Sequence, residues 1–236
     1  CALSSNNNNN NEIVGDEAAY LIKLREAISP APPTWFNVTN MCDWSHVICS
    51  TVGNNRSVEE INLNSMSLKG TLPSGLNNTF PYLRRLILYN NSLTGPLPSL
   101  AGLSSLREVV LSDNFTSIPH GCFQDLYSLD LLDLDSNTDL SPWTFPAYLT
   151  ASSGLDTLTL GSTNLMGSLP DIFGSFPDLK NLNLYGNSLT GTLPKSITKL
   201  LKLAILVLSE QEHGGLSGTI EFLLLEFKEQ RELREK

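Results

Sequence analysis

Apolar residues recur along most of this chain in one fixed arrangement. The segments NSLTGPLPSL (91–100) and NSLTGTLPKS (187–196) are near copies, and each belongs to a longer pattern, L-x-x-L-x-L-x-x-N-x-L-x-G-x-L-P. The pattern matches without a miss from Leu83 and from Leu179, and with small departures it begins seven times, at residues 58, 83, 106, 129, 155, 179 and 203. A period of about 24 residues predicts a solenoid in which each repeat forms one coil.

Each position of the repeat has a physical role. The L-x-L alternation predicts a short strand with two inward side chains, and the later Leu and Leu-Pro lie on the convex side. We expect an interrupted asparagine ladder, because amides after the strands can pair buried backbone groups that otherwise cost about 1–3 kcal/mol each. Its members are Asn91, Asn114, Asn137 and Asn187. This is a leucine-rich-repeat solenoid of α/β class, with short parallel strands on the concave face and a 3-10 or irregular convex side.

A different kind of segment, residues 16–57, precedes the repeats and is predicted to be an N-terminal cap. Asp16 is expected to N-cap a helix that begins at Glu17 and stops at Pro30. A cap is needed because the first coil would otherwise expose its core to water.

Two cysteines in the cap, Cys42 and Cys49, bracket Trp44 in the sequence MCDWSHVICS. We interpret them as a disulfide that closes the cap, with Trp35 and Trp44 covering apolar surface. Two reduced core cysteines are the alternative. A zinc site with His46 is less favoured because zinc needs more ligands at close spacing.

Three further segments complete the predicted organisation. Residues 1–15 are expected to be a signal remnant or disordered polar spacer, and residues 58–220 hold about seven repeats. Residues 221–236 form a charged tail with the pattern of an exposed helix. This tail is interpreted either as a cap on the last coil or as the mark of a truncated chain.

Composition and motifs argue against several functions. A formal net charge of −9 excludes a general nucleic-acid role, which needs clustered Lys and Arg. No phosphate loop, nucleophile elbow or zinc-ligand pair occurs, so we predict neither an enzyme nor a cofactor or metal site. The acidic run with Asp130, Asp133 and Asp135 is compatible with calcium, but a calcium site needs six or more oxygens, and the repeat register explains the run more simply.

Sequons favour the secretory pathway. We predict N-glycosylation at Asn37, Asn55, Asn77 and Asn90, each of which begins an Asn-x-Ser/Thr sequon.

The register also predicts which side chains face outward from the strands, at positions two, four and six after each repeat start. Among them, apolar residues within a charged rim have the composition of a protein interface. The candidate partner-binding residues are Arg85, Ile87, Tyr89, Glu108, Val110, Leu131, Asp133 and Asp135. The alternative is ordinary strand propensity, which favours Ile, Val and Tyr on any strand.

The cap with C-x-W…C and the L-x-G-x-L-P turns resemble the plant leucine-rich-repeat receptor-like kinases. The resemblance is greatest to the transmembrane-kinase (TMK) type, through GPLPSLAGLSSL at 95–106, NFTSIPHGCFQDL at 114–126 and SEQEHGGLSGTIEFL at 209–223. It implies an ectodomain on the apoplast side of the plasma membrane that binds an extracellular protein or peptide ligand or a co-receptor through its concave face. The TMK type further implies a secreted auxin-binding protein as a partner.

The sequence departs from that family in its later part. Such ectodomains continue through more repeats, a second cysteine-bearing cap, a membrane span and a kinase, and none of these is present in this sequence. The alternative function is a secreted inhibitor of a cell-wall-degrading enzyme, similar to the polygalacturonase inhibitors, which requires a doubly capped solenoid.

Overall fold

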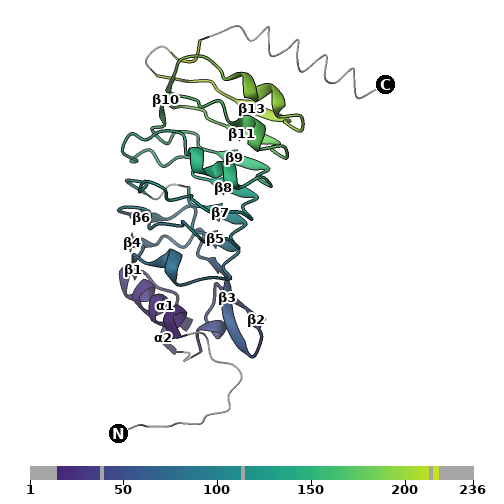
Figure 1. The fold of residues 1–236 in the computed structure, drawn as a ribbon. Helices are drawn as coiled ribbons and strands as arrows, with labels where there is room; N and C mark the ends of the chain where they lie inside the picture. The colour runs from purple at the N-terminus through teal and green to yellow at the C-terminus, as the bar shows by residue number, and fades with distance from the viewer. Residues whose placement is uncertain (1–14, 38–39, 113–114, 213–214, 218–236) are drawn as a thin grey trace.

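The computed structural model describes residues 15–37, 40–112, 115–212 and 215–217, which form a curved stack of coils with a helical cap at its N-terminal end (Figure 1). One sheet runs along the stack, with one strand from each coil in the order β13-β11-β9-β8-β7-β5-β3 and β2 (Val47–Val52) at its end. β2 pairs antiparallel with β3, and the others are parallel. The coil strands are β3 (Asn55–Asn62), β5 (Arg85–Ile87), β7 (Glu108–Val110), β8 (Leu131–Asp133), β9 (Thr157–Thr159), β11 (Asn181–Asn183) and β13 (Ile205–Val207).

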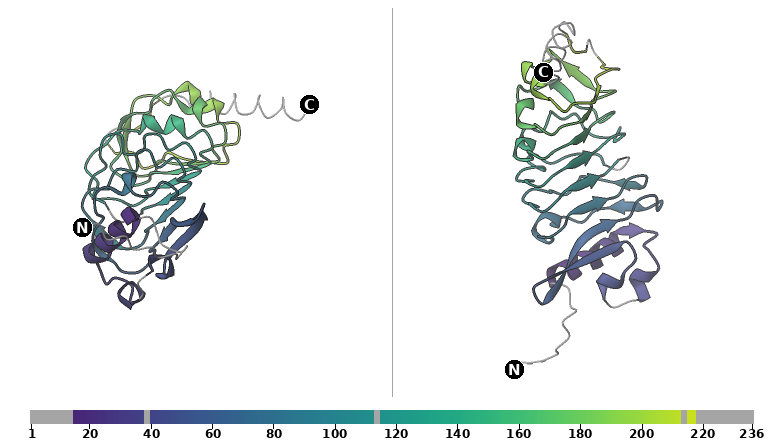
Figure 2. Two further views of the ribbon diagram at one scale, coloured as in Figure 1. Left: turned by 60° about the horizontal axis from the view of Figure 1, so that its bottom comes forward. Right: turned by 90° about the vertical axis from the view of Figure 1, so that its right-hand side faces the viewer.

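Shorter elements complete the coils. A second set of short strands follows β3, β5, β9 and β11, and together with β1 of the cap these strands pair as β1-β4-β6 and as β10-β12. Short 3-10 helices lie on the side opposite the main sheet, so the expected solenoid class is confirmed (Figure 2). These elements are β1 (Ile28–Ser29), β4 (Lys69–Thr71), β6 (Ser92–Thr94), β10 (Met166–Ser168), β12 (Ser188–Thr190), η2 (Leu76–Asn78), η3 (Ala147–Ala151), η4 (Phe173–Ser175) and η5 (Lys195–Lys199).

The core is a continuous column of apolar side chains, to which each strand contributes its central residue. Adjacent coils place equivalent residues side by side, for example Leu86 beside Val109 and Leu158 beside Leu182. The central residues of the first six coils are at most 1% exposed: Ile61, Leu86, Val109, Leu132, Leu158 and Leu182. One coil has no closed core of its own, so burial of this column holds the stack together.

An amide ladder runs beside the column. Asn187 accepts hydrogen bonds from the backbone N–H groups of Thr163 and Leu165 and donates to the carbonyls of Leu160 and Leu184, at 2.8–3.1 Å. Asn91 and Asn137 likewise bond backbone groups of the preceding coil and of their own coil, whereas Asn114 lies outside the described residues.

In the seventh coil a glutamine takes the ladder position. Gln211 accepts from the Leu189 N–H group and donates to the carbonyls of Leu184 and Leu208. Sequence analysis missed this residue, although it stands eight positions after the repeat start at 203, as Asn91 does after 83.

The cap packs against the first coil through a buried carboxylate. Helix α1 (Gly15–Ala27) begins before Asp16, so the expected N-cap at Asp16 is wrong: this residue lies within the first turn. Glu17 follows it and is fully buried. Its two oxygens accept from Ser57 Oγ at 2.5 Å and from the Val58 N–H group at 2.9 Å, which ties the helix to β3 because a buried carboxylate needs such partners.

The rest of the cap is closed by aromatic rings and a disulfide. Trp35, in α2 (Thr34–Asn37), stacks on Trp44 with ring centroids 4.8 Å apart, and both rings are buried. Cys42, in η1 (Met41–Asp43), is joined to Cys49 by a disulfide. The tail at 221–236 lies outside the described residues, and no helix within the described part has the length and apolar character to cross a membrane.

Candidate protein-binding face

The outward-facing residues of the main sheet form three rows along the concave side, which we call the concave face. The first row contains Glu60, Arg85, Glu108, Leu131, Thr157, Asn181 and Ile205. The middle row contains Asn62, Ile87, Val110, Asp133, Thr159, Asn183 and Val207. The third row follows the strands, with Asn64, Tyr89, Ser112, Asp135, Gly161, Tyr185 and Ser209.

All eight candidate partner-binding residues lie on three neighbouring coils of this face, but they do not form the expected apolar patch. Ile87 is only 7% exposed, so its predicted exposure is wrong. Val110 and Leu131 are half-buried, and Tyr89 is 38% exposed. Strands about 4.8 Å apart on an inward-curving face bring side chains close enough to shield one another, which favours burial of an apolar middle row.

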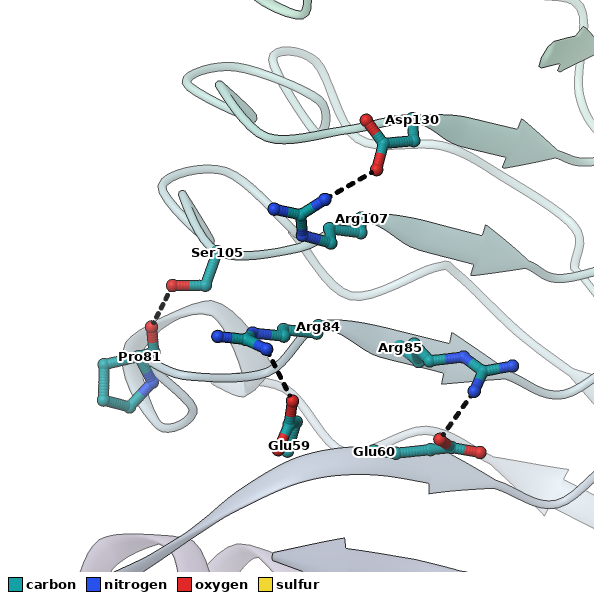
Figure 3. A network of polar contacts seen from close by, with 8 residues as sticks. All are labelled: Glu59, Glu60, Pro81, Arg84, Arg85, Ser105, Arg107 and Asp130. Atoms are coloured by element: carbon teal, nitrogen blue, oxygen red, sulfur yellow. Dashed lines mark hydrogen bonds and ion pairs between the residues drawn. The ribbon is translucent and has the colours of Figure 1, made fainter. Parts of the chain in front are cut away.

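The charges of the first three coils are paired with one another. Arg85 lies between two carboxylates and donates from Nε to Glu108 at 2.9 Å and from Nη1 to Glu60 at 3.1 Å. Beside this row, Arg84 pairs with Glu59 and Arg107 pairs with Asp130 (Figure 3). Every cation in this group already has an anionic partner, so this region offers little free charge to a ligand.

Two other carboxylates of the fourth coil, Asp133 and Asp135, have only neutral partners in the described contacts. Asp133 Oδ1 accepts from Ser112 Oγ at 3.1 Å and from the Asp135 N–H group at 2.9 Å. Asp135 accepts from the Gly161 N–H group at 2.5 Å and from Asn183 Nδ2 at 2.9 Å. Two carboxylates therefore stand close together without a cation, and their negative charge is directed to the concave face.

Burial raises the pKa of Asp135 to about 6. Repulsion from Asp133 adds to the rise, and the hydrogen bonds from Gly161 and Asn183 oppose it. The carboxyl therefore gains its charge over the mildly acid range.

Neighbouring coils also present buried polar atoms that have no protein partner. Thr159 Oγ1 and Asn181 Oδ1 are among the buried side-chain atoms without a hydrogen bond. Thr159 lies in β9 and Asn181 in β11, and an unpaired buried polar atom is costly unless a ligand or water satisfies it. Coils five and six therefore each hold one such atom.

The acidic run in the fourth coil raises the question whether metal-ligating side chains cluster in the described part of the chain. No group of three His, Cys, Asp or Glu residues there has a geometry that fits a metal ion. Asp130, which the calcium hypothesis grouped with Asp133 and Asp135, is paired with Arg107 instead.

The predicted glycosylation sites lie in the cap and the first two coils. Asn37, Asn55 and Asn90 are exposed, whereas Asn77 is half-buried. They stay predictions.

Comparison with known proteins agrees with this architecture. Residues 14–50 match the family model of the leucine rich repeat N-terminal domain, and residues 82–103 and 178–200 match the Leucine Rich Repeat model. The chain is a leucine-rich-repeat solenoid, similar to the ectodomains of plant receptor kinases. No kinase domain is evident in the described residues, all of which belong to the cap or the coils.

Two receptor-like kinases of Arabidopsis thaliana are similar to this leucine-rich-repeat domain. TMK2 is 32% identical over 212 residues, and TMK4 is 37% identical over 211 residues. The matches cover 88% and 89% of this chain but only 23% and 22% of the two relatives. The domain thus spans less than a quarter of the length of these kinases.

Two solved structures are similar in fold. The crystal structure of Pollen Receptor Kinase 3 superposes with a TM-score of 0.68 at 26% identity, covering 84% of this chain and 98% of that one. The PEPR1–AtPEP1 crystal structure gives a TM-score of 0.70 at 25% identity, covering 84% of this chain and 28% of that one.

Proposed function

We propose that this leucine-rich-repeat domain binds an extracellular protein or peptide partner, ligand or co-receptor, through its concave face, on the apoplast side of the plasma membrane. The similarity to TMK2 and TMK4 supports a place in cell-surface signalling. The PEPR1–AtPEP1 structure supports recognition by a solenoid of this shape. The comparisons give no support to the alternative of an inhibitor of a cell-wall-degrading enzyme.

The observation that carries the proposal is that charged residues at one end of the concave face are paired with opposite charges, whereas the two carboxylates of the fourth coil are not. Arg85 lies between Glu60 and Glu108 and pairs with both, whereas Asp133 and Asp135 contact no cation among the described residues. Electrostatic complementarity across an interface orients and selects the partner. The fitting partner therefore presents Lys, Arg or other hydrogen-bond donors to coils four to six.

The experiment is capture of a partner by the immobilised domain from plant apoplast fluid, with identification by mass spectrometry. The double reversal Asp133→Lys with Asp135→Lys is expected to lose the captured partner at unchanged solubility. The matched control, Asp171→Lys with Asp178→Lys, makes the same change in net charge away from the concave face and is expected to retain it. Equal capture by both variants would refute the concave-face proposal.

A second variant distinguishes loss of the two charges from loss of the folded structure. Asp133→Asn with Asp135→Asn keeps the size of both side chains, and its melting temperature shows whether the coils are intact. The secreted auxin-binding protein that the TMK resemblance implies is tested directly, as a purified partner with and without auxin.

A further inference from the structure

One side chain of the concave face connects three coils. Asp135 starts from coil four, accepts the Gly161 N–H group of coil five at 2.5 Å, and reaches Asn183 Nδ2 of coil six at 2.9 Å. Gly161 makes the crossing possible, since a Cβ there would lie 3.1 Å from both Asp135 Oδ1 and Asn183 Nδ2. We call this arrangement the Asp135 bridge.

The bridge continues into the backbone of coil six. Asn183 Oδ1 accepts the Tyr185 N–H group at 3.1 Å, so the amide of Asn183 is held with its nitrogen toward Asp135 and its oxygen toward Tyr185. This orientation requires that the Asp135 oxygen facing Asn183 be an acceptor. A carboxylate meets the requirement with both oxygens, because it has no proton to donate.

No cation stabilises the ionised form among the described contacts. The donors to Asp135 are a backbone N–H group and a neutral amide, and the charged residue that acts on it is Asp133 of the same coil, a like charge. The facing elements present Ser112 after β7, Thr157 and Thr159 from β9, and Asn181 and Tyr185 from coil six; Tyr185 is the titratable group among them.

We propose that Asp135 is a proton-operated switch that resets the hydrogen-bonding pattern of the concave face across coils four to six. A proton taken up from solvent onto Oδ2 turns this oxygen into an O–H donor that meets the Asn183 amide nitrogen, also a donor. Asn183 rotates about its amide axis and offers Oδ1 to the new hydroxyl. Asp135 Oδ1 keeps the Gly161 N–H group, and the Tyr185 N–H group loses its acceptor.

The two states present different surfaces. In the ionised state the face carries two carboxylates, and the Tyr185 N–H group is satisfied internally. In the protonated state it carries one carboxylate, and that N–H group is free for water or a ligand acceptor. Capture of a cationic partner should therefore weaken as the pH falls through about 6. This consequence rests on the proposed function.

The test is a pH titration of the free domain from about pH 4.5 to 7.5, followed by two-dimensional ¹⁵N–¹H NMR. Three signals report on the bridge: the backbone amides of Gly161 and Tyr185, and the side-chain amide of Asn183. We expect them to shift together with one midpoint near pH 6. The backbone amide of Ser196 is the internal control, because it donates to Asp171, whose pKa is lowered by hydrogen bonds from the Ser196 side chain and from this backbone amide.

Two variants sharpen the result. Asp133→Asn removes the like charge and is expected to lower the midpoint while the three signals still move together. Asp135→Asn is expected to abolish the transition and to hold the Tyr185 amide at its acid position throughout. The switch is overturned if the three signals show no midpoint between about pH 4.5 and 7.5, or if they move independently of one another.

The titration needs no partner, so its failure leaves the proposed binding face intact. Failure of the charge-reversal capture experiment in turn leaves the switch intact. The two ideas are therefore refuted by different measurements.

Discussion

Replacing Asn187 with Ala removes the ladder residue of the sixth coil, and its cost can be worked out group by group. The side chain is 2% exposed and bonds five backbone groups. The three carbonyls keep other partners, because Leu160 also accepts from Thr163 Oγ1, Leu184 from Gln211 Nε2 and Tyr185 from the Ser162 N–H group. The N–H groups of Thr163 and Leu165 lose the acceptor that Asn187 supplies.

Two buried N–H groups without acceptors cost about 1–3 kcal/mol each, so Asn187→Ala is expected to lower the free energy of unfolding by about 2–6 kcal/mol. The assay is urea unfolding at fixed pH and temperature, followed by circular dichroism. Because a solenoid can unfold in more than one step, hydrogen exchange of coils five and six accompanies it, and loss of protection is expected there first.

A matched control lies in the same coil. Asn181 is also an asparagine next to the strand core, but the structure gives its Oδ1 atom no hydrogen-bond partner. Asn181→Ala removes a buried oxygen without a partner and is therefore not expected to lower the free energy of unfolding. If Asn187→Ala proves as mild as Asn181→Ala, the ladder does not stabilise the stack and the argument from buried backbone groups is wrong.

Three further predictions concern the cap and the concave face. Glu17→Gln keeps only one of the two acceptor oxygens in a buried site. The free energy of unfolding in urea should therefore fall by about 1–3 kcal/mol. An unchanged urea midpoint would contradict a stabilising role for the Glu17 hydrogen bonds to Ser57 and Val58. Gly70→Ala places a Cβ 2.0 Å from the Ala27 carbonyl oxygen at a φ of +116°, so limited proteolysis should cut the cap faster; equal rates would contradict this close contact. The folded-state pKa of Asp135, about 6, lies above its value of 3.8 in the unfolded chain, so its stabilising proton is lost as the pH rises through that window. The melting temperature of Asp135→Asn relative to the native domain should therefore rise between pH 4 and 7, and a constant difference would refute the shift.

The repeat pattern predicts the fold well because one physical rule governs every coil. Period and register place the inward Leu, Ile and Val residues in the column and the outward residues in three rows, and the strand pairing reproduces those rows. Gln211 shows the limit of template matching. The longer side chain of Gln211 makes the same amide hydrogen bonds to the backbone as asparagine does in the other coils. A template that requires asparagine at this position therefore misses it.

The candidate site was harder to predict, because it depends on which outward side chains satisfy one another. Ile87 and Arg85 both face outward in the register. In the structure Ile87 is buried, and Arg85 forms ion pairs with two carboxylates. The Asp135 bridge joins residues 48 positions apart and depends on the missing side chain of Gly161. The sequence shows that Gly161 stands at an outward position. Which side chains cross above it depends on the positions of the neighbouring coils, so the hydrogen bonds could be found only in the structure.

The central claim, that the concave face of coils four to six binds the partner, is tested most directly by carboxyl footprinting. The domain is labelled with a carbodiimide and an amine, alone and with its captured partner, and the labelled residues are read by mass spectrometry. We predict that the partner protects Asp133 and Asp135 while Asp171 and Asp178 are labelled as in the free domain. Protection of Asp171 and Asp178 with full labelling of Asp133 and Asp135 would contradict the account.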